Sequence, residues 1–119
     1  MDTQKTVTLY RPTGEVELKL VEDANWESWP ARLPEQPIFY PVLNRKYAQI
    51  IARDWNAKIE GRGYVTQFLV NKEYLDQYEI QQVGGKDILE YWIPAEELEE
   101  FNRHIVGKIT VVDTYSRTV

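Results

Sequence analysis

Residues 78–94 read Tyr78-Glu79-Ile80-Gln81-Gln82-Val83-Gly84-Gly85-Lys86-Asp87-Ile88-Leu89-Glu90-Tyr91-Trp92-Ile93-Pro94 and carry the clearest hairpin pattern in the chain. Two runs of strand-forming residues flank the segment Gly84-Gly85-Lys86-Asp87. Glycine accepts the positive φ that tight hairpin turns require. The sequence therefore predicts two antiparallel strands joined at this turn.

Glu90 stands inside the second of these strands. Successive side chains of a strand point to opposite faces, so Leu89, Tyr91 and Ile93 share one face. Glu90 then shares the other face with large apolar neighbours, Ile88 and Trp92. A carboxylate in such surroundings loses hydration, which disfavours its charged form unless a donor or a cation compensates. Glu90 is a candidate catalytic residue or, alternatively, part of an ordinary polar strand face.

The remaining pattern alternates strands with helices. Strands are predicted at 6–11, 37–41, 64–70 and 108–112, in addition to the hairpin. The segment 12–14 breaks the first strand, and 25–37 is expected to be an irregular, aromatic-rich loop packed on the body. Residues 15–22 fit either a strand or a helix. One helical turn is expected over 71–76, with Asn71 as its cap.

Two longer helices are predicted. The first begins at Asn44, a good N-cap, and carries apolar side chains on one face: Tyr47, Ala48, Ile51, Ala52 and Trp55. The second begins at Pro94, buries Leu98, Phe101 and Ile105, and ends at Gly107. The sequence thus predicts an α+β fold with a mixed or mostly antiparallel sheet of about six strands and two or three helices. We expect one compact domain over residues 1–119, with a frayed tail at 113–119.

Bulk properties narrow the classes of function. A chain of 119 residues suits one domain, and the absence of cysteine excludes disulfides and thiolate chemistry. The formal net charge is −5, and Lys and Arg form no basic stripe, which argues against nucleic-acid binding. No signal peptide or membrane-spanning run is visible, so we expect a cytoplasmic protein without membrane partners.

Familiar catalytic motifs are missing. The single histidine, His104, has no partner at a metal-ligand spacing, so no metal site is predicted. Neither glycine pair is long enough to form a phosphate loop. The aromatic residues form either a cleft that stacks a flat ring or the core of a small sheet protein: Trp26, Trp29, Phe39, Tyr40, Tyr64 and Trp92. Arg11, at a strand end, suits either a phosphate contact or a salt bridge.

Three elements resemble the ADP-ribosyltransferase-like fold: Leu9-Tyr10-Arg11, the segment Ile38-Phe39-Tyr40-Pro41-Val42 that leads into a helix, and Leu89-Glu90-Tyr91-Trp92-Ile93-Pro94. The chain also resembles a small bacterial family labelled "ADP-ribosylation/crystallin J". The stretches that carry this resemblance are 34–44, 52–56 and 90–98.

The resemblance implies a site for NAD. In such a site Arg11 would grip the pyrophosphate of the cofactor, and Tyr40 would stack on the nicotinamide. Glu90 would hold a ribose hydroxyl and stabilise an oxocarbenium-like transition state, since a fixed carboxylate stabilises developing positive charge. Trp92 joins Arg11 and Tyr40 as an expected cofactor-binding residue.

Three hypotheses of function remain open at the level of sequence. The first is a protein that binds NAD or ADP-ribose, with NAD as substrate of a transferase and no metal. The second is a non-enzymatic protein-interaction module, such as an accessory or inhibitor protein. Its contact surfaces would be the loop Trp26 to Trp29 and the acidic helix Pro94 to His104. The third is a binder of another small metabolite in an aromatic cleft.

Overall fold

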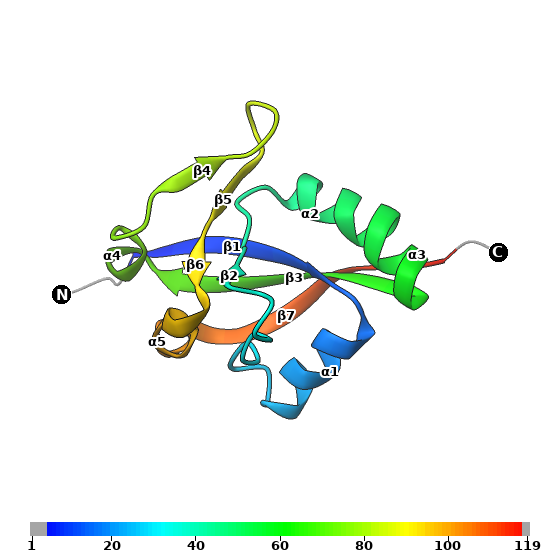
Figure 1. The fold of residues 1–119 in the computed structure, drawn as a ribbon, viewed down its shortest axis with the longest axis horizontal. Helices are drawn as coiled ribbons and strands as arrows, with labels where there is room; N and C mark the ends of the chain where they lie inside the picture. Colours follow the sequence, from blue (N-terminus) through cyan, green and yellow to red (C-terminus); the bar gives the residue numbers. More distant parts are fainter. Residues whose placement is uncertain (1–4, 118–119) are drawn as a thin grey trace.

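The computed structural model describes residues 5–117, which fold around a three-stranded antiparallel sheet. Its strands are β1 (Thr6–Thr13), β3 (Arg62–Asn71) and β7 (Ile105–Ser116), in the order β1-β3-β7 (Figure 1). The central strand β3 is rich in β-branched and aromatic residues that suit a sheet interior.

Two further strand pairs form two-stranded sheets of their own. Strand β2 (Ile38–Phe39) pairs with β6 (Ile93–Pro94), and β4 (Ile80–Gln82) pairs with β5 (Leu89–Tyr91). Isolated bridges from Tyr10 to Val42 and from Val42 to Glu90 connect β1 to β5. Every pairing is antiparallel, which confirms the predicted hairpin and the α+β class.

The helices are short and lie around the sheet (Figure 1). They are α1 (Glu15–Asp23), α2 (Arg45–Ile51), the π-helical segment η1 (Ala52–Asn56), α3 (Ala57–Glu60), α4 (Lys72–Leu75), the 3₁₀ turn η2 (Ala95–Glu97) and α5 (Leu98–Arg103). The ambiguous segment 15–22 is thus helical. Both predicted asparagine caps are confirmed, because the side chains of Asn44 and Asn71 accept hydrogen bonds from Tyr47 N and Tyr74 N.

The buried side chains form two clusters. The main core is made of Leu9, Val21, Trp29, Phe39, Phe68, Val70, Leu75, Tyr91, Ile93, Leu98, Phe101 and Ile109. The small core is made of Val42, Ala48, Ala52 and Val65, with Tyr10 and Tyr47 packed against it. Because Leu9 belongs to the main core and Tyr10 contacts the small core, the two cores lie on opposite faces of the sheet.

The apolar face of the helix over 45–60 differs from the prediction. Ala48, Ala52 and Ala57 are fully buried, but Trp55 is 64% exposed. The spacing of five residues between Ala52 and Ala57 is that of a π-helix, which is the geometry of η1. The wider turn brings Ala57 to the sheet and leaves Trp55 outside.

Three predicted boundaries are wrong. Strand β1 continues through Pro12 to Thr13, because the proline nitrogen points to the side of Tyr10 N, away from the ladder with β3. Strand β7 begins at Ile105, and Gly107 lies within it at a φ of 80° beside an irregularity in pairing. Residues 113–116, expected to fray, pair with β3.

Residues 24–37 form the irregular segment that the sequence predicts, and it is fastened to the body. The side chain of Asn102 accepts a hydrogen bond from Trp29 N at 2.8 Å and donates one to Trp29 O at 3.0 Å. Trp29 is thereby held in the main core. No helix within residues 5–117 is long and apolar enough to cross a membrane.

Candidate functional site

Glu90 is nearly buried, as the strand pattern predicts. The residue is 9% exposed, and its Oε1 accepts a hydrogen bond of 2.7 Å from the indole Nε1 of Trp92. Burial, and next the charge of Glu90, raise the pKa of Tyr47 in the neighbouring helix α2. Glu90 is thus a carboxylate under α2, held by one indole donor.

Arg11 does not join Glu90. The bridges from Tyr10 to Val42 and from Val42 to Glu90 place these three side chains on one face of the sheet, because directly paired residues share a face. Arg11 follows Tyr10 and therefore points to the other face. Its guanidinium lies over the ring of Phe39, with 4.6 Å between the guanidinium carbon and the ring centroid.

The Arg11 guanidinium is bound by a carboxylate from α1. Arg11 donates two hydrogen bonds to the carboxylate of Glu17, at 2.5 and 2.9 Å. A second arginine, Arg32, lies with its Nη1 at 4.0 Å from the same carboxylate and donates from Nη2 to the Ile38 carbonyl. The salt-bridge interpretation of Arg11 thus describes its contacts, while Arg32 and Glu17 are residues that the sequence analysis did not single out.

The aromatic residues separate into three groups. Trp29 and Phe39 are buried in the main core. Tyr40 and Trp92 meet edge to face with ring centroids 6.4 Å apart and are about two-fifths exposed, at 41% and 43%. Arg11 Nη1 reaches the Tyr40 carbonyl at 3.5 Å, so Arg11, Tyr40, Trp92 and Glu90 form a chain of contacts across the sheet. They do not line any of the larger hollows described below.

The third group contains Trp26, whose backbone conformation is unusual. Asn25 and Trp26 both have a φ of 61°. Asn25 ends α1 in a Schellman motif, since Asn25 N bonds to Glu22 O and Trp26 N to Val21 O. Left-handed backbone is common for asparagine and rare for tryptophan. Two further bonds hold the turn: Ile109 N donates to Trp26 O at 2.7 Å, and Lys108 Nζ donates to Asn25 O at 2.9 Å.

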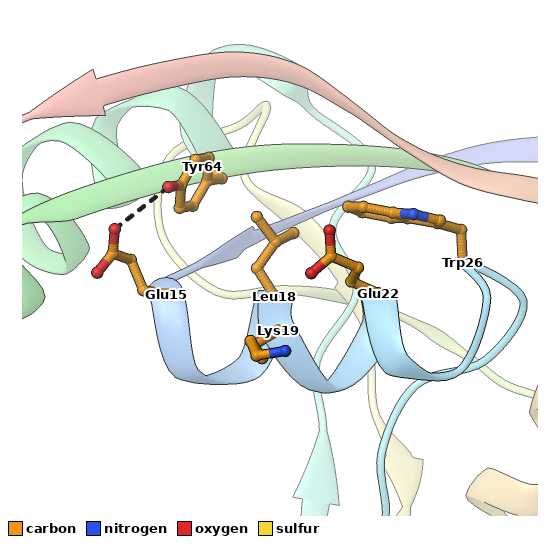
Figure 2. Close-up of a pocket in the computed structure, with 6 residues that line it drawn as sticks. All are labelled: Glu15, Leu18, Lys19, Glu22, Trp26 and Tyr64. Carbon is orange, nitrogen blue, oxygen red and sulfur yellow. Dashed lines mark hydrogen bonds between the residues drawn. The ribbon is translucent and has the colours of Figure 1, made fainter.

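A hollow of about 390 Å³ lies beside this turn, between α1 and β3. Figure 2 shows the side chains that line it, with Tyr64 at one end and the Trp26 indole at the other: Glu15, Leu18, Lys19, Glu22, Trp26 and Tyr64. We call this hollow the Trp26 groove. Its two carboxylates, Glu15 and Glu22, lie about two turns apart on α1, and its aromatic rings come from β3 and from the turn that follows α1.

The carboxylates of the Trp26 groove differ in their partners. Glu15 accepts a hydrogen bond of 3.5 Å from the Tyr64 hydroxyl and has Arg62 Nε at 3.9 Å. The side chain of Glu22 makes no hydrogen bond or ion pair with any residue in 5–117. Lys19 is engaged with Asp23 at 3.2 Å. The groove therefore holds a carboxylate whose acceptor capacity is free, between an aromatic face and an apolar floor.

The acidic side chains of segment 94–104 are less available for a ligand than those of the Trp26 groove. Glu99 and Glu100 both accept hydrogen bonds from Arg103 at 2.9 Å, and His104 stacks on Tyr74 with ring centroids 4.1 Å apart. Among the described residues, no group of three or more His, Cys, Asp or Glu side chains is placed to hold a metal ion.

Comparison of the chain with protein-family models and with curated proteins finds no match. The resemblance to the ADP-ribosyltransferase-like fold and to the "ADP-ribosylation/crystallin J" family stays a prediction.

Proposed function

We propose that this protein is a non-enzymatic protein-interaction module that binds a basic segment of a partner protein in the Trp26 groove. The observation that carries the proposal is the left-handed conformation of Trp26, which costs free energy and places a half-buried indole at the groove. A strained backbone at a bulky aromatic residue is typical of functional surfaces, and the second hypothesis from the sequence named this loop.

Charge complementarity selects the kind of side chain that fits. A guanidinium or ammonium group can contact the face of Trp26 and pair with the free carboxylate of Glu22 beside it. Cation–π contacts at such sites contribute about 0.5–2 kcal/mol, and Arg stacks on aromatic rings more readily than Lys. The net charge of −5 adds a long-range attraction for basic partners.

The experiment is an NMR titration. The probe is a short Gly/Ser peptide with one central arginine, and the readout is the chemical shift of the Trp26 indole N–H. We expect saturable shifts with an affinity of about 1 mM, the level that one anchoring side chain supports. The same peptide with citrulline, which keeps the shape and loses the charge, should bind at least about tenfold more weakly.

Matched variants locate the binding surface. Glu22→Gln should abolish the shift of the Trp26 indole N–H, and Trp26→Ala should abolish the peptide-induced shifts of the backbone amides around the groove. Trp55→Ala and Glu73→Gln, exposed residues of other helices, should leave both sets of shifts unchanged. Binding of the citrulline peptide equal to that of the arginine peptide would exclude recognition of a cation. Unchanged binding by Glu22→Gln would exclude this groove.

A second candidate function is binding of NAD or ADP-ribose near Glu90, with a transferase reaction as its chemistry. The observation that favours it is the nearly buried Glu90 carboxylate beside the half-exposed pair Tyr40 and Trp92. Arg11 would contribute only after leaving Glu17. Calorimetric titration with NAD tests binding, and loss of NAD consumption in Glu90→Gln tests catalysis. No heat of binding at about 1 mM NAD would exclude this candidate.

A further inference from the structure

A second hollow lies on the other side of α1 and has an arginine in its lining. Its volume is about 310 Å³. It lies among α1, the segment 30–36 and Phe39, and we call it the Arg32 groove. Its lining is Val16, Glu17, Leu20, Pro30, Ala31, Arg32, Leu33, Gln36, Phe39 and Glu60.

Glu17, in the lining of the Arg32 groove, faces two guanidinium groups, that of Arg32 in the lining and that of Arg11 behind it. The side chains of Arg11 and Arg32 are 12% and 11% exposed, and that of Glu17 is 24% exposed. Two cations therefore share one carboxylate, which leaves a net positive charge in a poorly hydrated place. Such a charge is costly unless an anion or further hydrogen bonds compensate it.

Glu17 accepts its short hydrogen bonds from Arg11, so most N–H donors of Arg32 lack an acceptor among the described residues. The two short bonds to Glu17 both come from Arg11, whereas Arg32 Nη1 stands off at 4.0 Å. Arg32 Nε is buried and has no hydrogen-bond partner among the described residues. A guanidinium has five N–H donors, and the Ile38 carbonyl accepts from one nitrogen of Arg32, at 3.1 Å.

Burial and the proximity of Arg11 both lower the pKa of Arg32, and Glu17 offsets this only in part. The other carboxylate on the groove, Glu60, is occupied elsewhere. Its Oε1 accepts a hydrogen bond from Val16 N, at the start of α1. The groove thus contains a cation without a full counter-ion.

The walls above Arg32 are apolar and open to water. Val16, Leu20 and Leu33 are 70%, 47% and 56% exposed, and all three line the groove. Large aliphatic side chains exposed together around a hollow indicate a binding surface. A ligand that covers them would gain about 25 cal/mol for each Å² of apolar surface removed from water.

We propose that the Arg32 groove binds a monoanionic carboxylate with an apolar body, whose oxygens pair with Arg32 while the body covers Val16, Leu20 and Leu33. The single charge matches the local excess of one positive charge among Arg11, Arg32 and Glu17, while the Glu60 carboxylate is bound to Val16 N at the start of α1. A free alkyl carboxylate and the C-terminal carboxylate of an apolar peptide share this chemistry.

The test measures binding calorimetrically and by the shift in melting temperature. The probes are octanoate for the free acid and N-acetyl-leucine for a peptide terminus, each compared with its neutral primary amide. We expect at least one acid to bind and to raise the melting temperature, and its amide to bind about 10- to 100-fold more weakly because a charge-assisted contact is lost. The stronger acid identifies the source of the carboxylate.

Three variants make the result specific. Arg32→Gln should weaken binding of the acid about 10- to 100-fold, and Leu33→Ser, at an exposed position, should weaken it through the apolar wall. Lys19→Gln, on the opposite side of α1, should have no effect. Equal binding of acid and amide, unchanged binding by Arg32→Gln, or no binding of either acid at about 10 mM would overturn the proposal.

Discussion

At the scale of single residues, a buried carboxylate depends on one neighbouring donor. Glu90 is 9% exposed and receives one side-chain hydrogen bond, from the indole of Trp92 two residues further along. Side chains two residues apart on a strand usually project from the same face, roughly parallel to each other. Here the side chain of Trp92 turns back towards the carboxylate, and 43% of the tryptophan stays exposed.

This pair gives the first prediction. Trp92→Phe removes the indole N–H and leaves most of the apolar ring, so we expect the free energy of unfolding at pH 7 to fall by about 1–3 kcal/mol. The same substitution in a Glu90→Gln background should cost markedly less, because the charge that needs the donor is gone. Urea denaturation of the four proteins measures the coupling. Strictly additive effects would contradict the role assigned to the indole.

The environment of Glu90 could be predicted from the sequence, but that of Arg11 could not. Alternation along a strand assigns Glu90 and Tyr91 to opposite faces, and the structure confirms this because Tyr91 belongs to the main core. The partner of Arg11 is Glu17, which lies in a segment whose sequence fits a strand or a helix equally well. Only the helix presents the Glu17 carboxylate to Arg11, so the ion pair could not be predicted.

At the scale of elements, the helix over 45–60 shows where pattern reading fails. The prediction assumed 3.6 residues per turn throughout, which puts Trp55 above Ile51 on the apolar face. The π-helical segment η1 adds a residue to one turn. The spacing of Ala48, Ala52 and Ala57 indicates the buried face correctly. Alanine is, however, a weaker indicator of a core face than tryptophan, so the prediction followed Trp55.

The close approach of η1 to β3 gives the second prediction. A Cβ atom on Gly63 would collide with the carbonyl oxygen of Ala52 and lie 3.0 Å from Ala57 N. Since both are backbone atoms, the helix would have to move, and Gly63→Ala should lower the free energy of unfolding by about 1–3 kcal/mol. Urea denaturation gives the value.

The matched control is Gly85→Ala in the hairpin turn. There a Cβ would meet Ile88 Cδ1 at 3.8 Å, an ordinary contact, so its unfolding midpoint should stay close to that of the parent protein. Equal midpoints for the two variants would show that β3 and the helix can separate at little cost.

Local signals predicted the elements better than their ends. The side chains of Asn44 and Asn71 are good N-caps and predicted two helix starts, and both caps are present in the structure. The extent of β1 and β7 was set instead by their shared partner β3, which has ten residues and pairs along nearly its whole length. Pairing between positions 35 or more residues apart, such as Val70 and Ile105, leaves no local mark in the sequence.

At the scale of the whole molecule, one carboxylate connects the second helix to the last strand. Asp113 of β7 accepts hydrogen bonds from Arg45 at 3.0 and 3.2 Å and from Gln49 at 3.1 Å. These bonds, chiefly the one from Arg45, lower the pKa of Asp113. They hold a segment that local sequence features suggested would fray.

The third prediction concerns pH. The pKa of Asp113 is lower in the folded state than its unfolded value of about 3.9, so its contribution to stability is complete above that pH and is lost as the pH falls through the folded pKa. Arg45 is 44% exposed, which limits the contribution to about 0.5–1 kcal/mol.

Asp113→Asn should therefore be less stable than the parent protein by this amount at pH 7, and the difference should shrink as the pH falls below about 3.9. Denaturant unfolding of both proteins at pH 7, 5 and 3 measures the difference. A gap of the same size at all three values would mean that Asp113 acts through packing and not through its charge.

The fixed turn at Asn25 and Trp26 has a kinetic consequence. Four hydrogen bonds anchor the backbone of this turn to α1 and β7. The turn that carries the indole is therefore already formed before a peptide binds. Capture at this surface should then proceed in one step, with a single exponential whose rate rises linearly with peptide concentration and falls as salt is added. The conformational entropy of this turn is already lost on folding. The rate of binding should therefore be limited by diffusional encounter and not by a rearrangement of the protein.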